Sequence, residues 1–190
     1  GEQGAQHSQA LHAWFAHVPG LRVVMPSTVA DARDLLIASV LCNDPVMYID
    51  DRWLYDQEDE LPPVVELNLT TQRPMVSITG GDITIVASGH ASLLAREAAQ
   101  QLENENVSVE VVDVRVLNPF HAEEIIESVK KTKNLLVVDS GWISGGFSAE
   151  VIAKVVEQLP VDCLSNPPVR VALPDAPAPT SRVLEKAYYT

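Results

Sequence analysis

The sequence predicts an α/β protein built on a mostly parallel β-sheet. In the second half of the chain, short apolar runs alternate with longer segments in which apolar residues recur at helical spacing. The runs at 82–87, 107–112 and 135–138 are apolar on both faces, which is typical of strands covered by helices on both sides of a sheet. Parallel strands need long crossover connections, and the helical segments between these runs supply them.

The first third of the chain predicts the order helix, strand, helix, strand. Pro19-Gly20 ends the first helix, and Ser27 or Thr28 can cap the second. The predicted helices cover 8–17 and about 28–42, and the predicted strands cover 21–25 and 46–49. Two strands make too small a sheet to stand alone.

The stretch 51–81 has no periodicity and is predicted to be a connector. It contains Pro62-Pro63 and Gly80-Gly81, and a structureless stretch of this length is unusual inside one domain. A cluster of carboxylates opens it, which is typical of a solvated segment, with an electrostatic recognition patch as the alternative. The cluster consists of Asp50, Asp51, Asp56, Glu58, Asp59 and Glu60.

The second unit continues with a helix after each strand. Ser88-Gly89 ends the first strand, and the helix that follows carries apolar residues from Ala91 to Leu102 on one stripe. Asn118-Pro119 ends the region of the second strand. The remaining predicted elements are helices around 125–129 and at 149–159 and a late strand at 169–173.

Two glycine-containing turns follow predicted strands, where ligands of open α/β sheets gather. The segment from Gly141 to Phe147 matches neither the dinucleotide fingerprint nor the P-loop, so we predict a tight turn that lets the next helix pack closely. His90, in Ser88-Gly89-His90, contacts a ligand or caps the following helix, and we predict the cap.

Composition and charge exclude several classes of function. The net charge of −13 argues against binding to a phosphate backbone, because nucleic-acid-binding proteins have basic faces, and it favours a basic protein partner. No apolar run approaches the length of a membrane span, and two cysteines form neither a disulfide framework nor a metal motif. We expect a cytoplasmic protein, without zinc and without a serine-hydrolase motif.

His7 is the main candidate for a catalytic residue in this sequence. It lies in Gly4-Ala5-Gln6-His7-Ser8-Gln9, between amide and hydroxyl side chains that can orient an imidazole. An imidazole transfers protons near neutral pH. The alternative is a surface or capping histidine.

Six segments of the chain carry a resemblance to a known family. The stretches 4–9, 13–21 and 23–27 resemble the β subunit of a 2-oxo acid dehydrogenase E1 component, and Ala5-Gln6 before His7 is most similar to pyruvate dehydrogenase β subunits. The stretches 113–119, 137–147 and 174–179 are similar to the transketolase carboxy-terminal domain in the same family. The resemblance covers nearly the whole chain in order.

The resemblance implies a division of the chain and an activity. Residues 1–50 correspond to the second half of a thiamine-diphosphate pyrimidine-binding domain, 51–81 to the connector, and 82–190 to the carboxy-terminal domain. The implied reaction is oxidative decarboxylation of a pyruvate-like 2-oxo acid with acyl transfer to lipoyl-E2, and His7 matches the catalytic histidine. The glutamate that activates the cofactor has no counterpart here, so we expect the isolated fragment to be inactive.

The resemblance also implies cofactors and partners. Thiamine diphosphate and Mg²⁺ are expected to be held mostly by parts outside this chain. Relatives bind potassium at positions that match Ser39, Val40, Cys42 and Asp44, of which Cys42 and Asp44 depart from the family pattern. The implied partners are an E1 α subunit, a second β subunit in an α2β2 heterotetramer and the lipoyl-bearing E2 subunit, in the cytoplasm or, in a eukaryote, the mitochondrial matrix.

Two alternatives stay open beside the E1 β subunit. One is another thiamine-dependent enzyme of the transketolase or carboligase type, which uses the same domains without a lipoyl acceptor. The other is a non-catalytic assembly module that binds E2, which the strongly negative net charge motivates.

Overall fold

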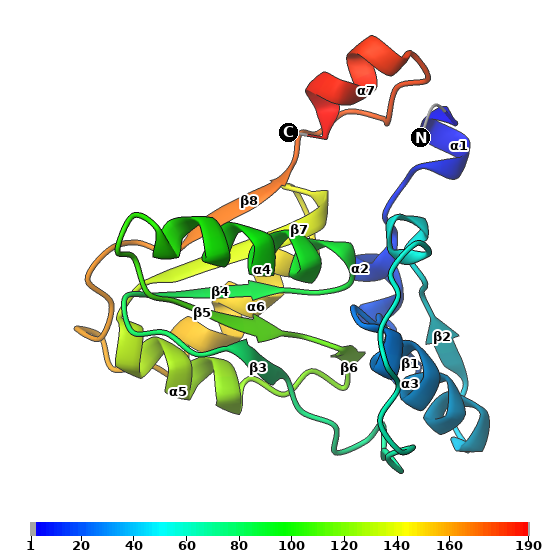
Figure 1. Cartoon of the computed structure of the whole chain (residues 1–190), viewed down its shortest axis with the longest axis horizontal. Helices are drawn as coiled ribbons and strands as arrows, with labels where there is room; N and C mark the ends of the chain where they lie inside the picture. Colours follow the sequence, from blue (N-terminus) through cyan, green and yellow to red (C-terminus); the bar gives the residue numbers. More distant parts are fainter. Residues whose placement is uncertain (1–2, 190) are drawn as a thin grey trace.

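A five-stranded sheet organises the second half of the chain in a computed structural model that describes residues 3–189 (Figure 1). The strand order is β3-β5-β4-β7-β8, and β5, β4, β7 and β8 are parallel while β3 runs antiparallel to β5. The strands are β3 (Met75–Ile78), β4 (Ile83–Ala87), β5 (Val109–Asp113), β7 (Leu135–Trp142) and β8 (Val169–Leu173). The predicted α/β class with a mostly parallel sheet is confirmed.

Helices cover both faces of this sheet. One face packs against α4 (His90–Glu103), whose Ala91, Ala95 and Ala99 are buried because residues four apart lie on the same side of a helix. The opposite face packs against α5 (Glu123–Thr132) and α6 (Phe147–Val156). Strand β4 contributes to both layers, with Ile85 against α4 and Val86 in the larger cluster with α5 and α6.

A second, three-stranded sheet joins the two parts of the chain. Its order is β2-β1-β6, with β1 (Arg22–Val24) parallel to β2 (Val46–Tyr48) and antiparallel to β6 (Val116–Asn118). Because β6 comes from the second half of the sequence, the two strands of the first third are joined in one sheet by a strand that follows the connector. Helix α3 (Val29–Leu41) packs on this sheet through Leu35 and Ala38.

The first predicted helix is wrong in its extent. Instead of one helix over 8–17, the structure has α1 (Gly4–His7) and α2 (His12–Ala16), separated by four residues. In a continuous helix the Ser8 carbonyl would accept the N–H of the residue four positions later. Here it accepts a hydrogen bond from the hydroxyl of Tyr189 at 3.0 Å, so a tertiary contact takes the place of the helical one.

The connector is also more ordered than its sequence predicts. It contains the short 3₁₀ helix η1 (Arg52–Leu54) and ends in β3, which pairs with β5 at the edge of the large sheet. Strand β6 and the last helix, α7 (Arg182–Tyr188), were likewise not predicted. Strands β3 and β6 depend on pairing with segments elsewhere in the chain, which leaves no local signal in the sequence.

Candidate functional site

His7 lies at the end of α1, the four-residue helix nearest the amino end (Figure 1). The Ser8 N–H closes the turn by donating to the Gly4 carbonyl at 3.0 Å. The His7 side chain is exposed, and within residues 3–189 its ring makes no hydrogen bond or ion pair. The imidazole is therefore open to a ligand, and its position depends on the main chain that carries it.

Residues 174–189, which we call the C-terminal arm, lie beside this turn, so that segments from the two ends of the chain meet (Figure 1). The Tyr189 hydroxyl donates to the Ser8 carbonyl at 3.0 Å, and the Ala178 N–H donates to the Gln9 side-chain carbonyl at 3.3 Å. Gly4 has φ +63° and is buried under Thr180, whose methyl carbon would lie only 2.5 Å from an added Cβ. The close approach requires a glycine here.

The C-terminal arm is attached in turn to the end of β7. The indole Nε1 of Trp142 donates to the Ala176 carbonyl at 2.9 Å, and the Tyr188 hydroxyl donates to the same oxygen at 2.8 Å. The Ser144 hydroxyl donates to the carboxylate of Asp175 at 2.6 Å. The His7 turn is thus connected through the arm to the central sheet.

A second histidine, His12, is buried against Asp139 and was not singled out from the sequence. Nε2 of His12 lies 2.9 Å from Oδ1 of Asp139, and the two side chains are only 1% and 3% exposed. The same carboxylate accepts the N–H groups of Gly141 at 2.8 Å and Ser148 at 2.7 Å. Burial opposes its ionisation, but these bonds prevail and hold the pKa of Asp139 below its ordinary value.

The segment from Gly141 to Phe147, which begins at the end of β7, contains a tight turn, as predicted. A Cβ on Gly146 would lie 2.2 Å from the Trp142 carbonyl oxygen and 2.9 Å from Oδ2 of Asp139. A Cβ on Gly141 would lie 3.1 Å from Oδ1 of the same carboxylate and 3.3 Å from His12. The glycines let the start of α6 fold around Asp139.

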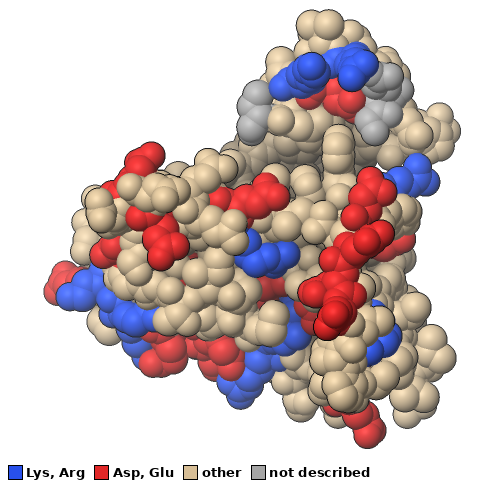
Figure 2. Space-filling model, viewed as in Figure 1, with Lys and Arg blue, Asp and Glu red and all other residues tan. Residues whose placement is uncertain are grey.

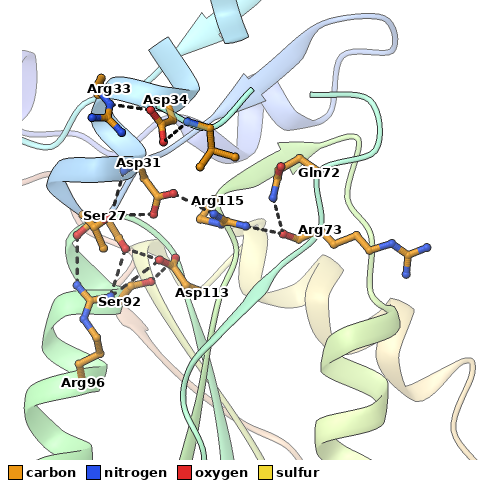
Figure 3. A network of polar contacts seen from close by, with 12 residues as sticks. Ser27, Asp31, Arg33, Asp34, Gln72, Arg73, Ser92, Arg96, Asp113 and Arg115 are labelled. Atoms are coloured by element: carbon orange, nitrogen blue, oxygen red, sulfur yellow. Dashed lines mark hydrogen bonds and ion pairs between the residues drawn. The ribbon is translucent and has the colours of Figure 1, made fainter. Parts of the chain in front are cut away.

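A network of polar side chains joins α3 and the residues before it to α4 and to the end of β5, as Figure 3 shows. Asp113 is fully buried and accepts hydrogen bonds from the hydroxyls of Ser27 and Ser92, the latter at 2.7 Å. Burial, opposed by these bonds, raises the pKa of Asp113 to about 6. Nearby, Arg115, the residue directly before β6, donates to Asp31 at 2.9 Å. This bond connects the start of β6 to the first turn of α3.

His90 does not cap α4, so that prediction is wrong. Gly89, with φ +56°, occupies the N-cap position, and no side chain donates or accepts a capping bond there. Instead the His90 ring stacks on Trp53 of η1 at a centroid distance of 5.7 Å. The contact between these two rings holds the connector against the start of α4.

The predicted cap of α3 is confirmed for Thr28, whose hydroxyl accepts the Asp31 N–H at 3.1 Å.

The four residues predicted to bind potassium lie at the end of α3 and in the turn beyond it. The Ser39 hydroxyl donates to the Leu35 carbonyl at 2.6 Å, and the Val40 side chain is exposed. Cys42 is the C-cap, and Asp44 pairs with Arg22, which donates to its carboxylate from Nε at 2.8 Å. The one carboxylate of this set is committed to a guanidinium, and the potassium site stays a prediction.

The surface adds two observations. The carboxylates of the acidic connector form a red stripe along one side of the molecule in Figure 2, and Asp56, Glu58 and Asp59 are exposed, as a solvated segment requires. Among the residues that the structure describes, no group of three or more His, Cys, Asp or Glu could hold a metal ion. None of the helices within 3–189 has the length and apolarity needed to cross a membrane.

Comparison with known families matches most of the chain to two domain types. The model of the transketolase C-terminal domain matches residues 75–190, and that of the transketolase pyrimidine-binding domain matches residues 1–57.

Curated relatives match over nearly the whole chain. The pyruvate dehydrogenase E1 component subunit beta of Rhizobium meliloti is 38% identical over 96% of this chain and 39% of its own length. The human mitochondrial subunit beta is 34% identical over 95% of this chain and 51% of its own length. The mitochondrial 2-oxoisovalerate dehydrogenase subunit beta 2 of Arabidopsis thaliana is 36% identical over 94% of this chain and 50% of its own length. The chain spans about half the length of the curated relatives it matches.

Among solved structures, a split-gene transketolase described as an inactive β4 tetramer has a TM-score of 0.75 to this chain. The two share 26% sequence identity, and the match covers 97% of this chain and 58% of the other.

Proposed function

The chain belongs to the transketolase family that includes the β subunits of 2-oxo acid dehydrogenase E1 components, and from this we propose that it is the part of such a β subunit that carries the proton-transferring histidine. The proposed reaction is oxidative decarboxylation of pyruvate or a related 2-oxo acid, with transfer of the acyl group to lipoyl-lysine of E2. The observation that carries the proposal is the exposed His7 ring on a main chain bonded to the C-terminal arm.

His7 suits this role because an imidazole gains and loses a proton near neutral pH. Its ring nitrogens make no hydrogen bond within residues 3–189, so either one is available to a substrate. We assign to a ring nitrogen of His7 the proton that the lipoyl sulfur takes up during acyl transfer. Thiamine diphosphate, when bound, supplies the electron sink that decarboxylation needs.

The described residues do not fit the metal-binding part of that cofactor. They contain no cluster of three or more His, Cys, Asp or Glu for Mg²⁺, and the buried carboxylates Asp113 and Asp139 are already bonded to side chains and main-chain N–H groups. We therefore assign the diphosphate and its magnesium to the E1 α subunit, and to this chain the wall of the site that carries His7.

Exposed apolar side chains on α3 support a protein partner. Val40 and Leu41 are 76% and 70% exposed, and Leu36 is 48% exposed, on the helix that covers the three-stranded sheet. Burying such side chains stabilises an assembly by removing apolar area from water. We propose an α2β2 heterotetramer, with the acidic surface available to a basic domain of E2.

A non-catalytic assembly of β chains is the second candidate. The observation that favours it is the likeness to the split-gene transketolase chain, which was solved as a tetramer described as inactive. The two candidates differ in one measurable property, because only the first transfers an acyl group.

The test uses the β subunit that contains this chain, purified with its α subunit, thiamine diphosphate and Mg²⁺. Reductive acylation of a lipoyl domain is measured with pyruvate and with 2-oxoisovalerate, for the wild type, His7→Ala and the control His17→Ala. His17 is also exposed and lies at the end of α2. We expect His7→Ala to lower acylation by about 10²–10⁴-fold, the usual contribution of a general acid–base group, and the control to retain it.

Each result separates the candidates. Full acylation by His7→Ala excludes His7 as the proton-transferring residue. Decarboxylation followed by transfer to an aldehyde, without lipoyl acylation, indicates a transketolase or carboligase. If the wild-type chains assemble but neither bind thiamine diphosphate nor show activity, the chain is the non-catalytic module.

A further inference from the structure

We infer that the C-terminal arm positions the main chain on which His7 stands, and that Tyr189 is the positioning residue. The inference rests on the proposed role of His7 and deepens it. It assigns a function to the arm and to its last described residue, neither of which follows from the sequence pattern.

The contact of Tyr189 falls on the first carbonyl after His7. Its hydroxyl donates to the Ser8 carbonyl oxygen at 3.0 Å, which lies in the break between α1 and α2. The Ser8 N–H meanwhile donates back to Gly4. Both main-chain groups of the residue next to His7 are therefore bonded, which fixes the direction in which the chain leaves α1.

Tyr189 is itself held by a packed neighbour. Its ring meets that of Tyr188 edge to face, with centroids 4.9 Å apart. Tyr188 is only 8% exposed, and its hydroxyl lies 3.0 Å from the indole Nε1 of Trp142 and 2.8 Å from the Ala176 carbonyl. A bond from Tyr189 to Ser8 thus transmits the position of β7 to the His7 turn.

The segment between α1 and α2 is also attached to β7 at its other end, through His12. His12, which opens α2, is bonded to Asp139, and Asp139 belongs to β7 as Trp142 does. Residues 8–12 are thereby attached to one rigid strand at both ends. The His12 attachment is buried, whereas the Tyr189 attachment is the part that lies next to His7.

The position of His7 depends on these attachments because its ring has no bond of its own within residues 3–189. A catalytic group acts only within a narrow range of positions, and a misplacement of about 1 Å costs about a hundredfold in rate. Loss of the Tyr189 bond should therefore lower turnover while leaving the binding of substrate nearly unchanged.

The test compares Tyr189→Phe with Tyr48→Phe. Each variant loses one hydroxyl that donates to a main-chain carbonyl, since the Tyr48 hydroxyl donates to Ala32 at 2.8 Å in α3. Hydrogen–deuterium exchange of the peptide 4–11 is measured on the 190-residue chain. Lipoyl acylation is measured on the complex with the α subunit, thiamine diphosphate and Mg²⁺, with kcat and KM determined separately.

For Tyr189→Phe we expect exchange within 4–11 to rise about three- to tenfold, as after the loss of one hydrogen bond. We expect kcat to fall about three- to thirtyfold at an unchanged KM. Tyr48→Phe should change neither quantity. A merely structural role of Tyr189 would not separate kcat from KM in this way.

Unchanged hydrogen–deuterium exchange within 4–11 in Tyr189→Phe overturns the inference. Faster exchange in Tyr189→Phe together with an unchanged kcat also overturns it, provided that His7→Ala is inactive. Full acylation in His7→Ala overturns the proposed function instead, and with it the catalytic purpose of the arm. The exchange rates still decide, in that case, whether the arm holds the turn.

Discussion

Nε2 of His12 lies 2.9 Å from Oδ1 of Asp139, although the two residues are 127 positions apart in the sequence. The pair joins α2, in the first part of the chain, to β7, which lies between β4 and β8 in the large sheet. It is buried in the contact between the two parts, so its loss should weaken their association.

Asp139→Ala should lower the free energy of unfolding by about 3–5 kcal/mol, the usual cost of removing one partner of a buried pair. His12 and the N–H groups of Gly141 and Ser148 would all lose their acceptor. Urea unfolding provides the measurement. Asp44→Ala is the control, because it removes an ion pair whose carboxylate is 44% exposed and should cost less than about 1 kcal/mol. Equal losses in the two variants would contradict the prediction.

Asp113 should make the protein less stable as pH rises. Burial raises its folded-state pKa to about 6 from 3.8, so between these values the unfolded chain loses the proton while the folded chain keeps it. Stability is therefore highest below pH 4 with respect to this group and falls until about pH 6. The accumulated difference is about 3 kcal/mol.

Asp113→Asn removes this titration and serves as the reference. We expect the unfolding free energy of the wild type, relative to the variant, to decrease by about 2 kcal/mol between pH 4 and pH 7, since part of the loss has already occurred at pH 4. Chemical unfolding at a series of pH values measures the difference. A constant difference across this range would show that Asp113 ionises in the folded protein as in the unfolded chain.

Gly146→Ala should destabilise the turn that encloses Asp139. The added Cβ would meet the Trp142 carbonyl oxygen at 2.2 Å, a main-chain atom that cannot move aside without displacing β7. We expect a loss of about 2–3 kcal/mol in the free energy of unfolding. Gly81→Ala is the matched control, since a Cβ there has no neighbour within 4 Å in the described chain. The control should change stability by less than about 0.5 kcal/mol.

Potassium should leave the thermal stability of this chain unchanged. Arg22 donates to the Asp44 carboxylate from Nε at 2.8 Å and from Nη2 at 2.5 Å, so a cation would have to displace a guanidinium. We expect equal melting temperatures in KCl and NaCl at the same ionic strength. An increase specific to KCl would support the potassium site that the resemblance implies, because a ligand that binds only the folded state raises its stability.

The fold was predicted best where apolar residues repeat over a full element. The strands β4, β5 and β7 and the helices α4 to α6 follow such patterns, and their order along the chain implied parallel pairing. The sequence does not predict the edge strand β3 or the joining strand β6, because they form by pairing with partners elsewhere in the sequence. Pairing partners of that kind leave no local signal.

The site was predicted only in its local part. His7 was singled out by its immediate neighbours and by a motif, whereas His12 and Asp139 were not. A signal for the buried pair does exist in the sequence: a histidine interrupts the apolar residues Leu11 and Ala13, and an aspartate follows the apolar run 135–138. Each polar group in such surroundings needs a partner, although the sequence does not identify which.

The sequence by itself determined the α/β class, the order of most elements and the residue on which the proposed chemistry depends, because periodicity and short motifs are local properties. Only the tertiary structure decided that β6 continues the first sheet, that Asp139 is the hydrogen-bond partner of His12, and that the C-terminal arm bonds the turn beside His7. These contacts join residues about a hundred or more positions apart, such as Ser8 and Tyr189 at 181. Their free energy becomes available only after the chain between them has folded.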